Sequence, residues 1–115
     1  MIKPTSLTAY EEILPELGER QILVLKAIRE LCKIQGDCTD QEIKRHLGKA
    51  EPNFVRPRRN ELVNDFKLVG YNQKRECQVT GKTALAWKVL DRQIDKMIMN
   101  AKPKIVINKE VLPDY

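Results

Sequence analysis

The sequence predicts a mainly α-helical fold: three helices, one small β-hairpin and a further helix toward the C-terminus. Two capping boxes, Thr8–Glu11 and Thr39–Glu42, have the threonine and glutamate three residues apart that mark helix starts. Apolar residues recur at helical spacing between them. Apolar and polar residues then alternate on both sides of Gly81, which is typical of a hairpin.

Length and composition set the class of protein. A chain of 115 residues forms one domain with a modest core, and 42% hydrophobic and 32% charged residues are ordinary for a globular protein. No apolar run approaches the roughly 20 residues that span a bilayer. Residues 1–6 lack the apolar core of a secretion signal. We therefore expect a cytoplasmic protein with no membrane partner.

The first half of the chain predicts an N-terminal arm and two helices. Residues 1–16 form the arm, with a short helix from Thr8 to Leu14 that stops before Pro15. A longer helix runs from Gly18 to Ile34. Its apolar face consists of Leu17, Val24, Ile28, Leu31 and Cys32. The next helix opens at Thr39, and Gly48 suits the left-handed position that closes it.

A third helix and the hairpin complete the central domain, residues 17–90. Asn53 is the predicted N-cap, and Pro57 requires a helix that begins no earlier than Asn53 and runs to about Phe66. One strand includes Cys77 and Val79, and the other covers 84–90. Three helices followed by a hairpin is the order of a winged helix-turn-helix domain, in which the hairpin packs on the helices.

Residues 91–115 differ in character from the central domain. A helix from Asp91 to Ala101 has an apolar face of Ile94, Met97 and Ile98. This face predicts either the seam of a homodimer or packing against the first long helix. Beyond Pro103 we expect Ile105–Ile107 either to add a strand or to dock as an extended tail, and the last residues, Glu110 to Tyr115, to be loose.

Charge is distributed unevenly along a chain whose net charge is +5. From Met1 to Glu30, four cations are outnumbered by five acids, whereas from Lys44 to Arg59 six cations face one acid. Such polarity within one domain indicates a face that binds a polyanion. We expect that partner to be double-stranded DNA.

We placed the side chains of the third helix around its axis at about 100° per residue. They divide into an apolar face for the core and an opposite face for the DNA partner. Asn53, Arg56 and Asn60 lie opposite the apolar face and are candidates for reading base edges, since Arg suits guanine and Asn suits adenine. The candidates for phosphate or flanking contacts are Arg58 on this helix, Lys44 and Arg45 on the preceding helix, and Lys74, Arg75 and Lys82 on the hairpin.

Arg59 falls inside the apolar face and is only a weak candidate for a DNA contact. A buried, unpaired guanidinium is costly. We expect it to extend outward along its own stem, to pair with Glu30 or Asp37, or to mark a slip in the helix register near Pro57.

The remaining reactive side chains form no pattern typical of catalysis or metal binding. Cys32, Cys38 and Cys77 contain no CxxC pair, and with His46 they match no zinc-finger spacing, so we expect inert thiols and no metal or cofactor. The sequence has no glycine loop for phosphate and no nucleophile–base pair, so we expect no enzyme activity. Trp87, which has apolar neighbours, is predicted to lie in the core beneath the hairpin.

Three motifs together resemble small winged helix-turn-helix proteins of phages and prophages: the helix Thr39–Gly48, the segment Asn53–Val63 and the segment Lys74–Gly81. The resemblance covers Leu17 to Val89 and implies a sequence-selective, dimeric DNA-binding protein that regulates transcription or replication. An adaptor that binds protein in a phage or replication assembly is the alternative. Two residues depart from the pattern: Arg59 replaces an aliphatic residue, and Lys67 replaces the glycine that ends the recognition helix.

Overall fold

The structure is a computed structural model that describes residues 12–48, 53–90 and 95–102. In these ranges it is a mixed α/β fold of four α-helices and a small antiparallel sheet. The elements are a 3-10 turn Leu14–Glu16, helices α2 (Glu19–Gln35), α3 (Asp40–Leu47) and α4 (Val55–Asn64), strands β1 (Val69–Glu76) and β2 (Thr83–Val89), and helix α5 (Asp95–Met99). The predicted order of helices and hairpin is therefore confirmed.

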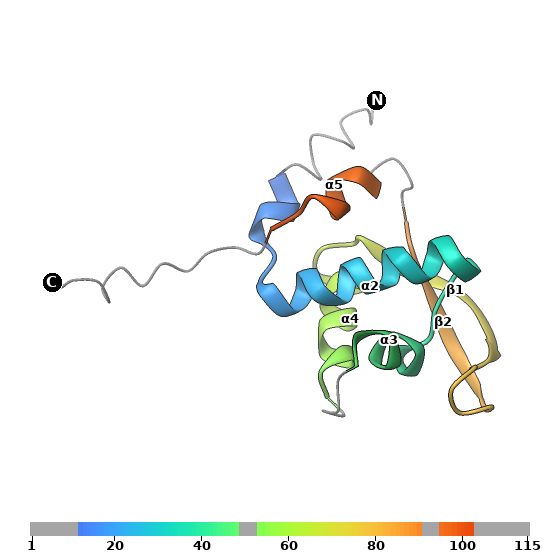
Figure 1. Cartoon of the computed structure of the whole chain (residues 1–115). Helices are drawn as coiled ribbons and strands as arrows, with labels where there is room; N and C mark the ends of the chain where they lie inside the picture. The colour runs from blue at the N-terminus through green and yellow to red at the C-terminus, as the bar shows by residue number, and fades with distance from the viewer. Residues whose placement is uncertain (1–11, 49–52, 91–94, 103–115) are drawn as a thin grey trace, which may run out of the picture.

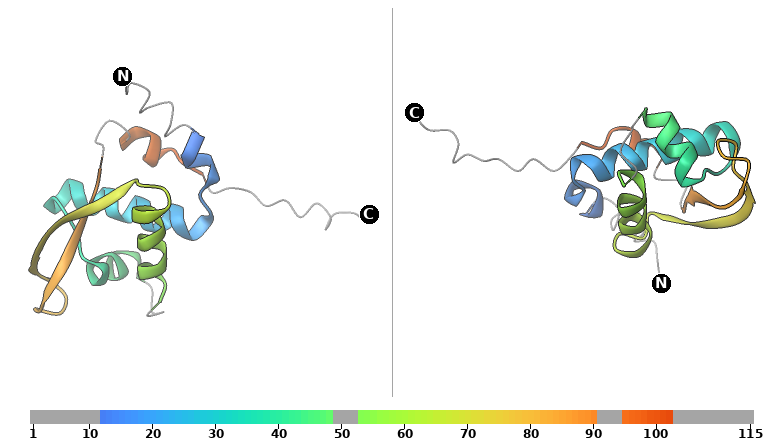
Figure 2. Two further views of the ribbon diagram at one scale, coloured as in Figure 1. Left: turned by 180° about the vertical axis from the view of Figure 1, so that it is seen from behind. Right: turned by 90° about the horizontal axis from the view of Figure 1, so that it is seen from below.

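Helix α2 runs through the middle of the fold (Figure 1). It contacts α3 and α4 on one side and α5 on the other, and β2 packs against it as well. The hairpin crosses the helices and its turn extends toward the side that carries α3 (Figure 2). Helices α3 and α4 and the tip of the hairpin therefore lie on the side opposite α5.

Local chemistry explains where α3 begins and ends. The hydroxyl of Thr39 accepts the N–H of Glu42, and the Glu42 carboxylate accepts the N–H of Thr39, so the predicted capping box is confirmed. Gly48 closes the helix with φ at 68°, as predicted.

One predicted helix start is wrong. Helix α4 begins at Val55, late enough to place Pro57 in its first turn, but its N-cap residue is Phe54 and not Asn53, and no side chain caps it. The α-helical residues of the first helix end at Ile13, before Pro15 as predicted, and a 3-10 turn then continues to Glu16. The start of that predicted helix lies outside the described residues.

The sheet joins β1 and β2 in an antiparallel register that pairs Tyr71 with Trp87 and Glu76 with Thr83. Cys77 and Val79 belong to the connecting turn and not to a strand, which corrects the sequence prediction, because Gly81 donates its N–H to the Cys77 carbonyl and has φ at 74°. An isolated bridge adds Cys38 to the free edge of β2, with hydrogen bonds of 3.0 and 2.7 Å to and from Trp87. The order across the sheet is thus Cys38, β2, β1.

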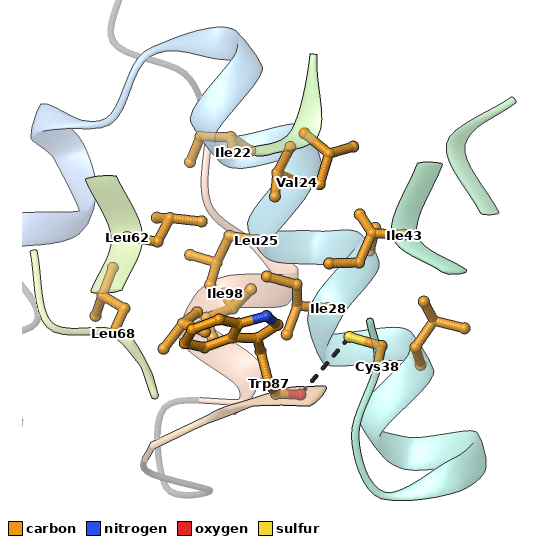
Figure 3. Packing of buried hydrophobic residues seen from close by; sticks show 14 of the residues in the cluster. Ile22, Val24, Leu25, Ile28, Cys38, Ile43, Leu62, Leu68, Trp87 and Ile98 are labelled. Carbon is orange, nitrogen blue, oxygen red and sulfur yellow. Dashed lines mark hydrogen bonds between the residues drawn. The ribbon is translucent and has the colours of Figure 1, made fainter. Parts of the chain in front are cut away.

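The core gathers around α2 (Figure 3). Leu25 and Ile28 of α2 are fully buried, as are Leu62 of α4 and Leu68 before β1. The ring of Trp87 is buried among these side chains, which confirms its predicted place in the core. Each such side chain contributes about 1.5–3 kcal/mol by leaving water.

Helix α5 belongs to the same core. Ile98 is fully buried and Met97 packs against the core, while Asp95 accepts a 2.7 Å hydrogen bond from Arg29 of α2. These side chains are covered by the chain's own α2, so the predicted dimer seam through Met97 and Ile98 is wrong and the alternative of intramolecular packing is correct. The predicted cap Asp91 and the third seam residue, Ile94, lie outside the described residues. Among the helices in the described ranges, none has the length and apolar character needed to cross a bilayer.

Candidate nucleic-acid interface

Five of the predicted cations lie on α3, α4 and the hairpin without an ion-pair partner in the described part of the chain. They are Lys44, Arg45, Arg56, Lys74 and Lys82, and we call them the free cations. Four of them are exposed, and Lys44 is half-buried. The three elements that carry them share one side of the fold (Figures 1 and 2). Their charge is therefore available to an external anion.

The outer face of α4 presents Asn53, Arg56 and Asn60, all exposed as the helical unrolling predicted. The side-chain oxygen of Asn60 accepts a hydrogen bond from the guanidinium of Arg59. This bond fixes the orientation of the amide, so the amide nitrogen, a donor, is directed away from Arg59.

The sequence predicted that Arg58 points outward to a phosphate, but in the structure its side chain lies mostly within the fold. Its side chain is only 25% exposed, and its Nε lies 3.7 Å from the carboxylate of Glu61. The same carboxylate oxygen accepts a 2.8 Å hydrogen bond from Gln21 of α2. Arg58 thus takes part in the contact between α2 and α4, and only part of its charge faces solvent.

Arg59 joins α4 to α3 and to the sheet. Its guanidinium donates two hydrogen bonds, of 2.9 and 2.6 Å, to the carboxylate of Asp40 at the start of α3. It also stacks over the ring of Trp87 at 4.0 Å from the ring centre. The alternative of pairing with a carboxylate is thus confirmed, but the partner is Asp40 and neither Glu30 nor Asp37, and the charge is satisfied inside the fold. Arg59 therefore positions α4 and is not available as a DNA contact.

Arg75 is held by two buried acids, which corrects its prediction as a free cation of the hairpin. It donates two hydrogen bonds of 2.7 and 2.8 Å to Glu42, and a third of 2.8 Å to Asp37. The carboxylates are 1% and 3% exposed, respectively. Arg75, Asp37 and Glu42 form a cluster that we call the hairpin clamp, because it ties β1 to the start of α3.

The pKa values of the two acids reflect this clamp. Burial disfavours the charged form of Glu42, but hydrogen bonds from Arg75 and from the N–H of Gln78 outweigh it and lower the pKa of Glu42 to about 2. Burial also opposes ionisation of Asp37, yet hydrogen bonds from Gln73, Asn72 and Arg75 lower its pKa. Both acids therefore stay ionised and keep Arg75 in place.

Sequence reasoning missed the acids of this region. Glu42 carried only a capping signal, Asp37 was considered only as a partner of Arg59, and Asp40 was not singled out. No local sequence pattern predicts the hydrogen bond between Arg75 and Asp37, because the two residues come from separate segments of the chain. One signal did predict geometry: Lys67, at the position of the expected glycine, has φ at 55° in the left-handed region.

No group of three or more His, Cys, Asp or Glu side chains within the described ranges could hold a metal ion. His46 is on the surface of α3, where its Nε2 lies 2.7 Å from the carboxylate of Glu30. Comparison of the chain with protein-family models, with curated proteins and with solved structures finds no match. The residues of the site must therefore carry the functional argument.

Proposed function

We propose that this chain is a winged-helix protein that binds double-stranded DNA, with α4 in the major groove and the β1–β2 hairpin beside it. The observation that carries the proposal is the set of free cations on α3, α4 and the hairpin, the elements that lie on the side of the fold opposite α5. Neighbouring arginines of the same segments are consumed by internal acids, whereas these five side chains are not. Several unpaired cations around a helix with exposed amides suit a phosphate backbone and its bases.

The sheet supports the winged-helix assignment. In such a domain the hairpin gains stability by packing on the helices. Cys38 lies between α2 and α3 and bridges Trp87 of β2, not β1. The hairpin is thereby anchored along one edge and its turn extends beside α3, and Arg59 and the hairpin clamp hold α4 and β1 to α3.

The proposed contacts follow from exposure. Arg56 and Asn60 on α4 read base edges in the major groove, with Asn53 near the start of the helix. Asn60 acts as a donor, because Arg59 directs its amide nitrogen outward. Lys44, Arg45, Lys74 and Lys82 contact phosphates. The protein would act in the cytoplasm on transcription or replication.

The test measures duplex binding by fluorescence anisotropy over a range of salt concentrations. Four phosphate contacts predict a slope of log K against log salt of roughly −4. Arg56→Ala should weaken binding by about 1–3 kcal/mol. Lys96→Ala is the matched control, because Lys96 is an exposed cation on α5, on the opposite side of the fold.

Two outcomes would overturn the proposal. The first is a lack of duplex affinity at low salt. The second is an equal loss of affinity in Arg56→Ala and Lys96→Ala, because binding would then depend on net charge and not on the α3–α4–hairpin side. If duplex binding is absent, the adaptor function becomes the better reading, and the exposed Val79 and Leu85 of the hairpin are the apolar residues to test for it.

A further inference from the structure

Two cysteine thiols meet where the end of α2 lies beside β2. Cys32 is in the last turn of α2, and Cys38 is the residue that bridges β2. Their sulfur atoms lie 4.0 and 3.7 Å, respectively, from the same carbonyl oxygen, that of Trp87. Figure 3 shows the Cys38 thiol directed at this oxygen. The fold thus holds two thiols side by side.

The two thiols differ in access. Cys32 is half-buried and lines a cavity of about 680 Å³ between α2, the start of β1, the end of β2 and α5. Cys38 is fully buried. A small reagent that enters the cavity therefore reaches Cys32 first, and Cys38 lies behind it.

The cavity favours a thiolate at Cys32. Lys88 lines it, as do Arg29 and Lys33, which form ion pairs with Asp95. A hydrogen bond from Cys38, with smaller contributions from the backbone N–H of Val89 and from Lys88, outweighs burial and the negative charge of Asp37 and lowers the pKa of Cys32 to about 7. The same hydrogen bond and burial raise the pKa of Cys38, which stays protonated. Cys32 then has roughly tenfold more thiolate at pH 7 than an ordinary cysteine.

We propose that Cys32 is a peroxide-reactive thiol and that Cys38 resolves its oxidised form into a Cys32–Cys38 disulfide. The Cys32 thiolate attacks one oxygen of hydrogen peroxide. The O–O bond breaks, an S–O bond forms, and hydroxide leaves and takes a proton from solvent to become water. The sulfur of Cys38 then attacks the sulfur of Cys32. The S–O bond breaks, the S–S bond forms, and the hydroxide leaves as water with the thiol proton of Cys38.

An accessible thiolate beside a second thiol is the arrangement that favours reversible oxidation over further oxidation of sulfur. The disulfide would join the last turn of α2 to the segment that bridges β2. Cys77 provides the internal contrast. It is 1% exposed, its sulfur lies 3.1 Å from the hydroxyl of Thr39, and it is not among the residues that line this cavity.

The experiment treats the full, reduced chain with hydrogen peroxide and follows intact mass and peptide maps. The expected product has lost two hydrogen atoms and contains a Cys32–Cys38 link. Cys77→Ala, the matched control, should form the link at the wild-type rate, and Cys32→Ser should not form it. Cys38→Ser should accumulate sulfenic acid at Cys32, which dimedone captures.

Mapping of the wild-type chain decides the proposal even if a cysteine variant fails to fold. A link that includes Cys77 would overturn it. So would oxidation of Cys32 that goes on to sulfinic acid with no disulfide, or a Cys32 that reacts no faster than Cys77. The proposal does not depend on DNA binding.

Discussion

Removal of the Arg75 side chain should lower the free energy of unfolding far more than removal of the side chain of its neighbour Lys74. Arg75→Ala leaves the carboxylates of Glu42 and Asp37, 1% and 3% exposed, without their shared cation. The lowered pKa of Glu42, about 2 against 4.5, corresponds to about 3 kcal/mol at 1.36 kcal/mol per pKa unit. Removing one partner of a buried pair costs about 3–5 kcal/mol in general.

We therefore expect Arg75→Ala to lower the free energy of unfolding by about 3–5 kcal/mol. This is a large share of the roughly 5–15 kcal/mol of an ordinary domain. Urea denaturation followed by circular dichroism measures the change. Lys74→Ala is the matched control: Lys74 is adjacent on β1, is exposed and makes no ion pair within the described residues, so its loss should change stability by less than about 0.5 kcal/mol.

The two variants should show the reverse order in DNA binding. Lys74→Ala removes a free cation and should weaken duplex affinity with little loss of stability, whereas folded Arg75→Ala loses no phosphate contact. Equal stability of the two variants, within about 1 kcal/mol, would refute the reasoning that the hairpin clamp holds β1 to α3.

Three further perturbations test other parts of the structure. The pKa of Glu42 is lower in the folded state, so the contribution of its carboxylate to stability is complete above pH 4.5 and disappears as the pH falls toward 2. In an acid titration, the free energy of unfolding of Glu42→Gln should therefore lack this part of the decrease that the wild type shows. Lys67→Gly should raise the free energy of unfolding by about 0.5–1 kcal/mol in thermal denaturation, because φ is 55° there, and Lys67→Ala should give no such gain. Ile98→Ala should cost about 2–5 kcal/mol and leave the molar mass by light scattering unchanged; dissociation of a dimer by this variant would contradict the intramolecular packing of α5.

Sequence reasoning succeeded where local chemistry decides the structure. The start of α3 follows from Thr39 and Glu42, its end from Gly48, and the late start of α4 from Pro57. Each of these features depends on residues within a few positions of one another, so the pattern in the sequence contains the information.

The candidate site was harder to predict because its charges pair across elements. Arg75 is indistinguishable in sequence from its neighbour Lys74, yet it meets acids that other elements supply. The place of Arg59 in the apolar face set it apart from Arg56, but it did not reveal that Asp40 of α3 is the partner. Helix α5 illustrates the same limit. The spacing of Met97 and Ile98 predicted an apolar face, but only the packed structure shows that α2 covers it.

The most direct test of the DNA-binding proposal is nuclear magnetic resonance of the isotope-labelled chain during titration with a duplex. We predict shifts of the amide signals at 53–60 on α4, at Lys44 and Arg45, and at 74–82 on the hairpin, with the signals of α5 unchanged. Shifts concentrated on α5, or none at any duplex concentration in low salt, would contradict the assignment of the free cations to DNA.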